Sequence, residues 1–177
     1  MKKLFLAFAL LASCMINAQD YEIKNGAITI TKIIETSLTA VEIYDATQTF
    51  FAGSYGDSNK TQRLNTENHL IYNGLFVNVN SNSYMAVDYK HSIDVSIKEN
   101  RVKIQVSCKD GQYYGKGETA RYDYDIVESY PISKTNKCPA LAKKLYEGAV
   151  TGGVKRMHEA IAAYEEVLKQ KSTEEDW

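Results

Sequence analysis

The chain has 177 residues, a length that suits one ordinary domain with an extension and leaves little room for two full domains. Hydrophobic residues make up 44% of it and charged residues 24%, with only 10 Gly and 2 Pro. This composition excludes collagen-like, disordered and multi-span membrane proteins.

The first eighteen residues have the composition of a signal peptide. Lys2 and Lys3 form a positive start, and the apolar stretch Leu4–Ala12 follows. This stretch is too short to span a membrane, which takes about 20 apolar residues. Ile16-Asn17-Ala18 before Gln19 fits a signal-peptidase site. We therefore predict that residues 1–18 are removed and that the protein is exported, to the periplasm or the medium.

A second interpretation of the same segment is lipidation. Leu11-Ala12-Ser13-Cys14 matches the bacterial lipobox, in which Cys14 becomes an acylated N-terminus and anchors the protein to a membrane. Met15 and Ile16 continue the apolar run, where lipoproteins usually turn polar, so soluble export is preferred. A buried N-terminal strand or helix is the third alternative. Both processing routes place the protein outside the cytoplasm.

Processing changes the charge and the cysteine count. Loss of two lysines reduces the 21 basic residues to 19 against 22 acidic ones, a formal net charge of −3. That charge offers no general attraction to nucleic acid, and we expect no nucleic-acid partner. Cys108 and Cys138 remain in a compartment that permits oxidation, and they are a candidate disulfide; two separate thiols are the alternative.

The first half of the mature chain predicts a strand followed by a helix. Residues 27–31 alternate apolar and polar side chains, and Ile33 and Ile34 extend the pattern. Thr39 and Glu42 form a capping box, which predicts a helix over residues 39–53. Leu38 and Ile43 are spaced to form its hydrophobic staple.

Four further strands are predicted after the helix. They cover residues 70–79, 92–98, 101–108 and 122–126, and the middle two form a hairpin with one apolar and one polar face. We expect residues 80–83 to form a loop. The glycine-containing stretch 110–120 predicts a turn or an irregular excursion.

The C-terminal part predicts helix. Apolar residues recur at helical spacing over residues 139–171, where Gly148, Gly152 and Gly153 should divide or bend the helix. The acidic residues 172–177 should fray. The whole predicts an α+β domain over residues 21–135, in which an antiparallel sheet packs against the helix of the first half, with the C-terminal helical segment as a further cover.

The element order resembles a known family. The strand at 28–35, the helix at 39–51, the segment Leu70–Gly74 and the hairpin at 90–108 are similar to exported bacterial domains of unknown function with a TATA-binding-protein-like (TBP-like) fold. The resemblance implies a TBP-like β-α-β(4) order over roughly residues 25–130. It supplies no active-site residues, and its fold name does not imply DNA binding in an exported, slightly acidic chain.

The sequence contains no recognisable catalytic, cofactor-binding or metal-binding constellation. His69, His91 and His158 have no metal-ligand spacing, and solvated or strand-edge positions are expected for them. Residues 115–120 fit Gly-x-Gly-x-x-Ala but should open a strand, where dinucleotide binding requires a helix. Asp123 and Asp125 share a face, which a solvated strand explains more simply than acid–base catalysis.

The tyrosines suggest a binding surface. Tyr113, Tyr114, Tyr122 and Tyr124 cluster near the glycine-containing stretch, and exposed Tyr is favoured at recognition surfaces. We expect a protein or glycan partner in the cell envelope there, with packing of these rings on the sheet edge as the alternative. The predicted function is a non-enzymatic binding or scaffolding module. A hydrolase whose His and carboxylate residues come from distant segments is the other candidate.

Overall fold

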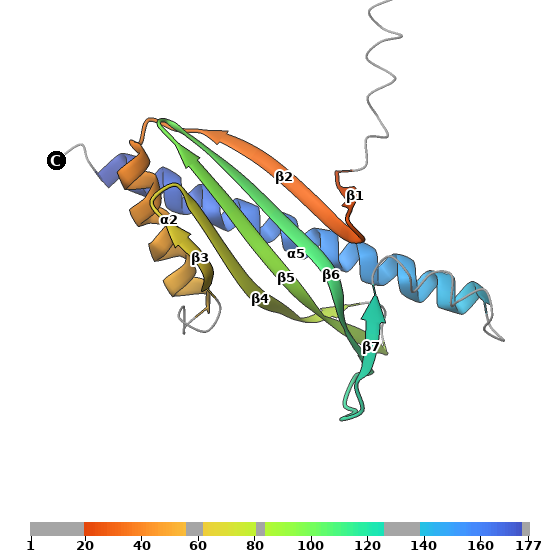
Figure 1. The fold of residues 1–177 in the computed structure, drawn as a ribbon. Coiled ribbons are helices and arrows are strands. Elements are labelled where there is room, and N and C mark those ends of the chain that lie inside the picture. Colours follow the sequence, from red (N-terminus) through yellow and green to blue (C-terminus); the bar gives the residue numbers. More distant parts are fainter. Residues whose placement is uncertain (1–19, 56–61, 81–83, 126–138, 175–177) are drawn as a thin grey trace, which may run out of the picture.

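The computed structural model describes residues 20–55, 62–80, 84–125 and 139–174. Nine elements follow one another along these ranges (Figure 1). They are β1 (Glu22–Lys24), β2 (Ala27–Glu35), α2 (Ala40–Tyr55), β3 (Gln62–Thr66), β4 (His69–Asn80), β5 (Met85–Lys98), β6 (Arg101–Gly115), β7 (Tyr122–Asp125) and α5 (Pro139–Glu174).

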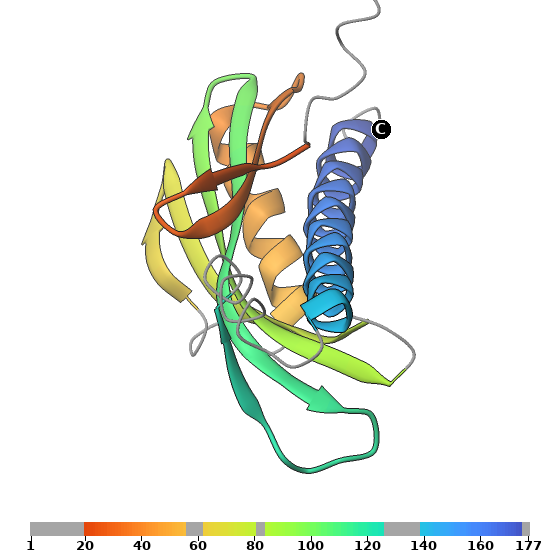
Figure 2. The same cartoon turned by 90° about the vertical axis from the view of Figure 1, so that its right-hand side faces the viewer.

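The strands form one antiparallel sheet with the order β1-β2-β6-β5-β4-β3. Strand β6 is long enough to carry two neighbours on the same side, since β2 pairs with residues 101–108 and β7 with residues 110–113. Both helices lie on one face of this sheet (Figure 2), which we call the inner face. The α+β architecture predicted from the sequence is therefore confirmed.

The predicted strands and their hairpin are present. Residues 27–34 lie in β2, and β5 and β6 join through a two-residue turn at Glu99-Asn100, where Asn100 has a φ of 57°. From residue 91 to 97 of β5 and from 102 to 108 of β6, buried residues alternate with more exposed ones. The predicted apolar and polar faces follow from this alternation.

The capping box begins α2 as predicted. The Thr39 backbone N–H donates to Oε2 of Glu42 at 2.7 Å, and the Glu42 N–H donates to Oγ1 of Thr39 at 3.4 Å. The hairpin turn adds a third contact, because the Ala40 N–H donates to Oε2 of Glu99 at 3.1 Å. These carboxylates satisfy N–H groups that the first turn of a helix leaves free.

Two short strands were not predicted. Strand β1 returns to β2 through Asn25-Gly26, both with positive φ, which is the common two-residue hairpin turn. Strand β3 has the sequence Gln-Arg-Leu-Asn-Thr, whose single apolar residue gives little signal. Most of the loop predicted at 80–83 lies outside the described residues.

The prediction of an irregular excursion at 110–120 was wrong in its first half. Strand β6 continues to Gly115 and pairs there with β5, and the turn begins only afterwards. Gly111 lies within the sheet, paired with Tyr89 and Tyr124, and a Cβ there would meet the backbone carbonyl of Asp88. A glycine that signals a turn in the sequence instead permits a close approach of two strands.

The C-terminal helix is not divided at its glycines. Helix α5 runs unbroken from Pro139 to Glu174, so of the two predicted effects of the glycines, division or bending, division is wrong. Gly153 is buried, and a Cβ there would lie 3.1 Å from the Tyr89 ring. The glycine thus lets the helix approach the sheet. Ser172 and Thr173 are helical, and their hydroxyls donate to carbonyls one turn back. The predicted fraying at 172–177 stays a prediction, because residues 175–177 lie outside the described residues.

The core lies between the inner face and the two helices. Phe51 of α2 stacks on Tyr72 of β4 with ring centroids 3.6 Å apart, and Phe50 meets Tyr164 of α5 edge-on. The hydroxyls of Thr47 and Tyr164 lie 2.7 Å apart and join α2 to α5. Thus α5 shares one core with the rest of the domain. Within the described residues, no helix is both long and apolar enough to cross a membrane.

The strand contact at Gly111 gives the first prediction. Gly111→Ala should lower the free energy of unfolding by about 1–3 kcal/mol, the usual cost of overpacking, because β5 and β6 would have to separate. Gly53→Ala in α2 is the matched control: open space surrounds the added methyl, so helix propensity should leave stability equal or higher. Urea unfolding of both variants measures the difference, and equal stability would contradict the argument.

Candidate functional site

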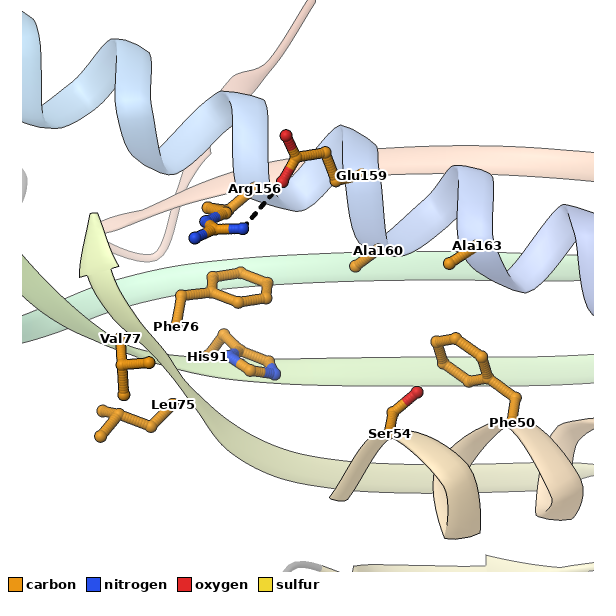
Figure 3. Close-up of a pocket in the computed structure, with 10 residues that line it drawn as sticks. All are labelled: Phe50, Ser54, Leu75, Phe76, Val77, His91, Arg156, Glu159, Ala160 and Ala163. Carbon is orange, nitrogen blue, oxygen red and sulfur yellow. Dashed lines mark hydrogen bonds and ion pairs between the residues drawn. The ribbon is translucent and has the colours of Figure 1, made fainter. Parts of the chain in front are cut away.

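A groove of about 300 Å³ opens between the inner face of the sheet and the two helices (Figure 3). Its lining comes from α2, β4, β5 and α5 and consists of Phe50, Ser54, Leu75, Phe76, Val77, His91, Arg156, Glu159, Ala160 and Ala163. Its volume lies at the lower end of the range for small-molecule sites, and its composition, apolar walls with few polar groups, is also typical of them.

Two stacked rings form one end of the groove, which we call its floor. Phe76 of β4 and His91 of β5 lie with ring centroids 3.8 Å apart and planes inclined by 17°. Both side chains are on the inner face, whereas Leu75 and Val77 point away from it and are about half exposed (Figure 3). The register of β4 shifts between Phe76 and Val79, so the strand bends immediately beyond this stack.

The imidazole in the groove is held neutral by its surroundings. His91 is only 4% exposed, and burial lowers its pKa from 6.5 to about 4. Desolvation penalises the charged form, which is the cause of the shift. At neutral pH the groove floor therefore presents an uncharged heteroaromatic ring beside a phenyl ring.

The rim of the groove is charged. Nη1 of Arg156 donates to Oε2 of Glu159 at 3.1 Å, and Figure 3 shows the guanidinium on the side of α5 that faces Phe76. Lys155 lies 3.9 Å from the other oxygen of Glu159. Arg156 and Glu159 thus form the charged part of the rim, and Lys155 contacts Glu159 from outside the groove. Helical spacing puts the lining residues of α5 along one stripe of the helix: Arg156, Glu159, Ala160 and Ala163.

A second, smaller hollow of about 190 Å³ lies between α2 and α5. Its lining residues are Asp45, Ala46, Thr49, Val167, Gln170 and Lys171. No aromatic ring is among them, so this hollow offers a small molecule less apolar contact than the groove does.

The four tyrosines of the predicted partner surface do not share one face. Tyr113 and Tyr122 are directly opposite each other in the β6–β7 pair, and their rings stack with centroids 5.1 Å apart. Tyr114 follows Tyr113 in an extended strand and therefore points to the other face. Tyr124 pairs with Gly111 through its backbone, and its side chain lies outside the described residues.

Tyr114 is occupied by contacts within the protein. Its hydroxyl donates to Oδ1 of Asp88 at 2.8 Å, and the guanidinium of Arg121 lies 3.6 Å from the centre of its ring. Asp123 is exposed and accepts a hydrogen bond from Gln112. Among the three tyrosines whose side chains are described, Tyr122 is therefore the one with the most exposed ring, at 52%.

The histidines are placed on different surfaces. His91 is buried, which corrects the expectation that it would be solvated. His69 is half-buried on the other face of β4, 2.9 Å from Oδ1 of Asp94, and His158 is exposed on α5. Among the described residues, no three His, Cys, Asp or Glu side chains are grouped to hold a metal ion.

Of the three cysteines, Cys108 lies among the described residues. Cys108 is buried in β6, and burial raises the pKa of its thiol to about 12. Cys138 and Cys14 lie outside the described residues, so the disulfide and the lipidation stay predictions. The glycine motif at 115–120 leads into β7, a strand, as expected for a chance match.

The groove has no signature in the sequence because its lining residues come from four elements. One signal was available for His91, which precedes Ile93, Val95 and Ile97 in the same alternation and therefore shares their buried face. No comparable signal identifies Arg156 or Glu159, since charged residues on a long helix are usually solvated.

Comparison with known proteins finds relatives in structure alone. No family model matches the sequence, and no curated protein matches it. A TBP-like protein from Parabacteroides distasonis superposes with a TM-score of 0.59 at 17% identity, covering 83% of this chain and 98% of the other. The fold is TBP-like.

A second solved structure agrees. A DUF4468 family protein from Bacteroides ovatus gives a TM-score of 0.52 at 13% identity, covering 83% of this chain and 91% of the other. The predicted resemblance to bacterial domains of unknown function with a TBP-like fold is therefore confirmed at the level of the fold. An aromatase/cyclase from Streptomyces, with a TM-score of 0.35, is too distant to inform on activity.

The buried His91 gives a prediction about pH. Its folded-state pKa of about 4 lies below the unfolded value of 6.5, so the unfolded chain takes up a proton that the folded protein does not bind. The free energy of unfolding should fall as the pH drops from 6.5 towards 4, by roughly 3 kcal/mol in total. Urea unfolding across this range should show a smaller pH dependence for His91→Phe. An NMR titration placing the pKa of His91 near 6.5 would contradict the assignment.

Proposed function

We propose that this protein is an exported, non-enzymatic binding module whose ligand is a small molecule held in the groove beneath α5. The observation that supports the proposal is the groove itself, which combines aromatic walls with a polar rim on the helix-covered face. Export is supported by the charged and apolar pattern of residues 1–18.

The arrangement of titratable groups favours binding over hydrolysis. A hydrolase of the kind considered above needs a base and an acid within reach of one reacting atom. His91 faces the groove, but His69 lies on the opposite face and His158 is exposed. Glu159 on the rim is engaged by two cations. A neutral imidazole and a paired carboxylate suit the recognition of a ligand better than proton transfer.

The β6–β7 hairpin is the proposed contact for a larger envelope partner. Tyr122 presents half of its surface to solvent and is supported from behind by Tyr113, which packs partly against the core. Sugar rings and protein partners pack against aromatic side chains, which are rigid and lose little conformational entropy on binding. We therefore retain a protein or glycan partner here and place it on Tyr122.

A neutral apolar probe tests the groove. N-phenyl-1-naphthylamine should bind the wild-type protein with increased fluorescence, and Ala160→Leu should weaken that binding at least tenfold because the larger side chain fills the groove. Ala162→Leu is the matched control, an exposed alanine on the same helix that does not line the groove. The proposal fails if the probe does not bind, or if both variants reduce binding equally.

The hairpin surface has a separate test. Tyr122→Ala should reduce crosslinking to envelope partners, or binding to immobilised envelope glycans, several-fold, because an exposed ring is removed. Tyr84→Ala removes another exposed tyrosine, 80% accessible, and should leave capture unchanged. Mass spectrometry of the crosslinked products identifies the partner. Unchanged capture by the Tyr122 variant argues for the alternative role of these rings as sheet-edge packing.

A further inference from the structure

We infer that the ligand of the groove is a small amphipathic carboxylate, whose apolar body lies against Phe76 and Phe50 and whose carboxylate binds Arg156. This inference rests on the proposed binding function and adds the chemical class of the ligand. It is carried by the charge of the rim and by the position of the guanidinium over the aromatic floor.

Arg156 is the cation that reaches the aromatic end of the groove. Figure 3 shows its guanidinium between Glu159 and Phe76, so a group lying on the aromatic rings meets the cation before the carboxylate. Glu159 also has a second partner outside the lining, Lys155, at 3.9 Å. The floor adds no charge of its own at neutral pH, because burial keeps His91 neutral. Charge complementarity at the guanidinium therefore favours an anion over a cation.

Arg156 is available to a ligand at low cost. Its side chain and that of Glu159 are each 48% exposed, and ion pairs with this much solvent contact contribute little to stability. A ligand carboxylate can replace Glu159 on the guanidinium while Glu159 stays with Lys155. The planar guanidinium binds a carboxylate through two parallel hydrogen bonds, a geometry that a lysine does not offer.

The walls define the rest of the ligand. Phe50, Phe76, Ala160 and Ala163 present apolar surface, and the two alanines leave the width that a chain or ring needs (Figure 3). Ser54, at the α2 side, is an uncharged hydroxyl. A volume of about 300 Å³ suits a short acyl chain or a small aromatic compound, and it excludes a whole phospholipid.

Matched ligands of equal length test the inference. Octanoate and octanol differ only in the head group, and both can be measured by displacement of N-phenyl-1-naphthylamine and by calorimetry. The wild-type protein should bind octanoate about tenfold more tightly than octanol, as expected for a charge-assisted contact. Arg156→Gln should remove this preference, and urea unfolding of the variant at wild-type stability shows that it is folded, since the Arg156 side chain is half exposed.

Two further variants separate a specific contact from general charge. Glu159→Gln removes the competing carboxylate and should strengthen octanoate binding a few-fold. Lys169→Gln deletes one positive charge from an exposed site on α5 outside the groove and should change nothing. Equal effects of Arg156→Gln and Lys169→Gln overturn the inference, as does an unchanged octanoate preference in the Arg156 variant.

The outcomes distinguish a failure of the groove as a binding site from a failure of the carboxylate as its ligand. Binding of the neutral probe and octanol without a preference for octanoate keeps the groove as a site and rejects the carboxylate. Absence of binding by every probe rejects the groove and the carboxylate together. Tighter binding of a hydrophobic peptide with a free C-terminus than of octanoate would reject a small acid as the occupant.

Discussion

The rest of the structure depends on covering one apolar sheet face. Strands β4, β5 and β6 direct their large apolar side chains to the inner face, and such a face is stable only when other elements remove it from water. Helix α2 alone is too short for the length of β5 and β6, so α5 must supply the remaining cover. Its close approach at Gly153, where the Tyr89 ring lies against the helix backbone, shows how tightly that cover is seated. The buried hydroxyl pair of Thr47 and Tyr164 then fixes the two helices relative to each other.

The groove follows from the same packing. Helix α5 inserts Met157, Ile161 and Tyr164 into the core, whereas the neighbouring positions 160 and 163 are alanines. Small residues beside large ones on a helix leave a space along one side of the contact, and the bend of β4 beyond Phe76 keeps the sheet from closing it. The groove thus lies where the two helices cover the inner face of the sheet incompletely. Its charged groups, Arg156 and Glu159, lie on the rim because α5 turns its charged side towards solvent there.

Local patterns predicted the elements, and their failures have a common physical origin. Alternation in β5 and β6 and the capping box at Thr39 are short-range signals, and the structure confirmed both. Gly111 and Gly153 were interpreted by their local tendency to break strands and helices, but each is tolerated because another element packs against its missing side chain. That contact joins residues far apart in the chain and has no local signature. The groove belongs to the same class, since the stacking of Phe76 on His91, which are diagonal neighbours on β4 and β5, depends on the register of the two strands.

The division between floor and rim determines which residues report on function. Phe76 and His91 help to close the core, so substitutions there change stability and binding together and cannot separate the two. Arg156 and Glu159 are half exposed and make their ion pair in water, so their loss leaves the core intact. The hairpin tyrosines sit at another part of the sheet, on β6 and β7, with no residue in common with the groove. Substitutions can therefore abolish ligand binding in the groove and partner binding at Tyr122 separately. The two binding events are independent unless α5 itself moves.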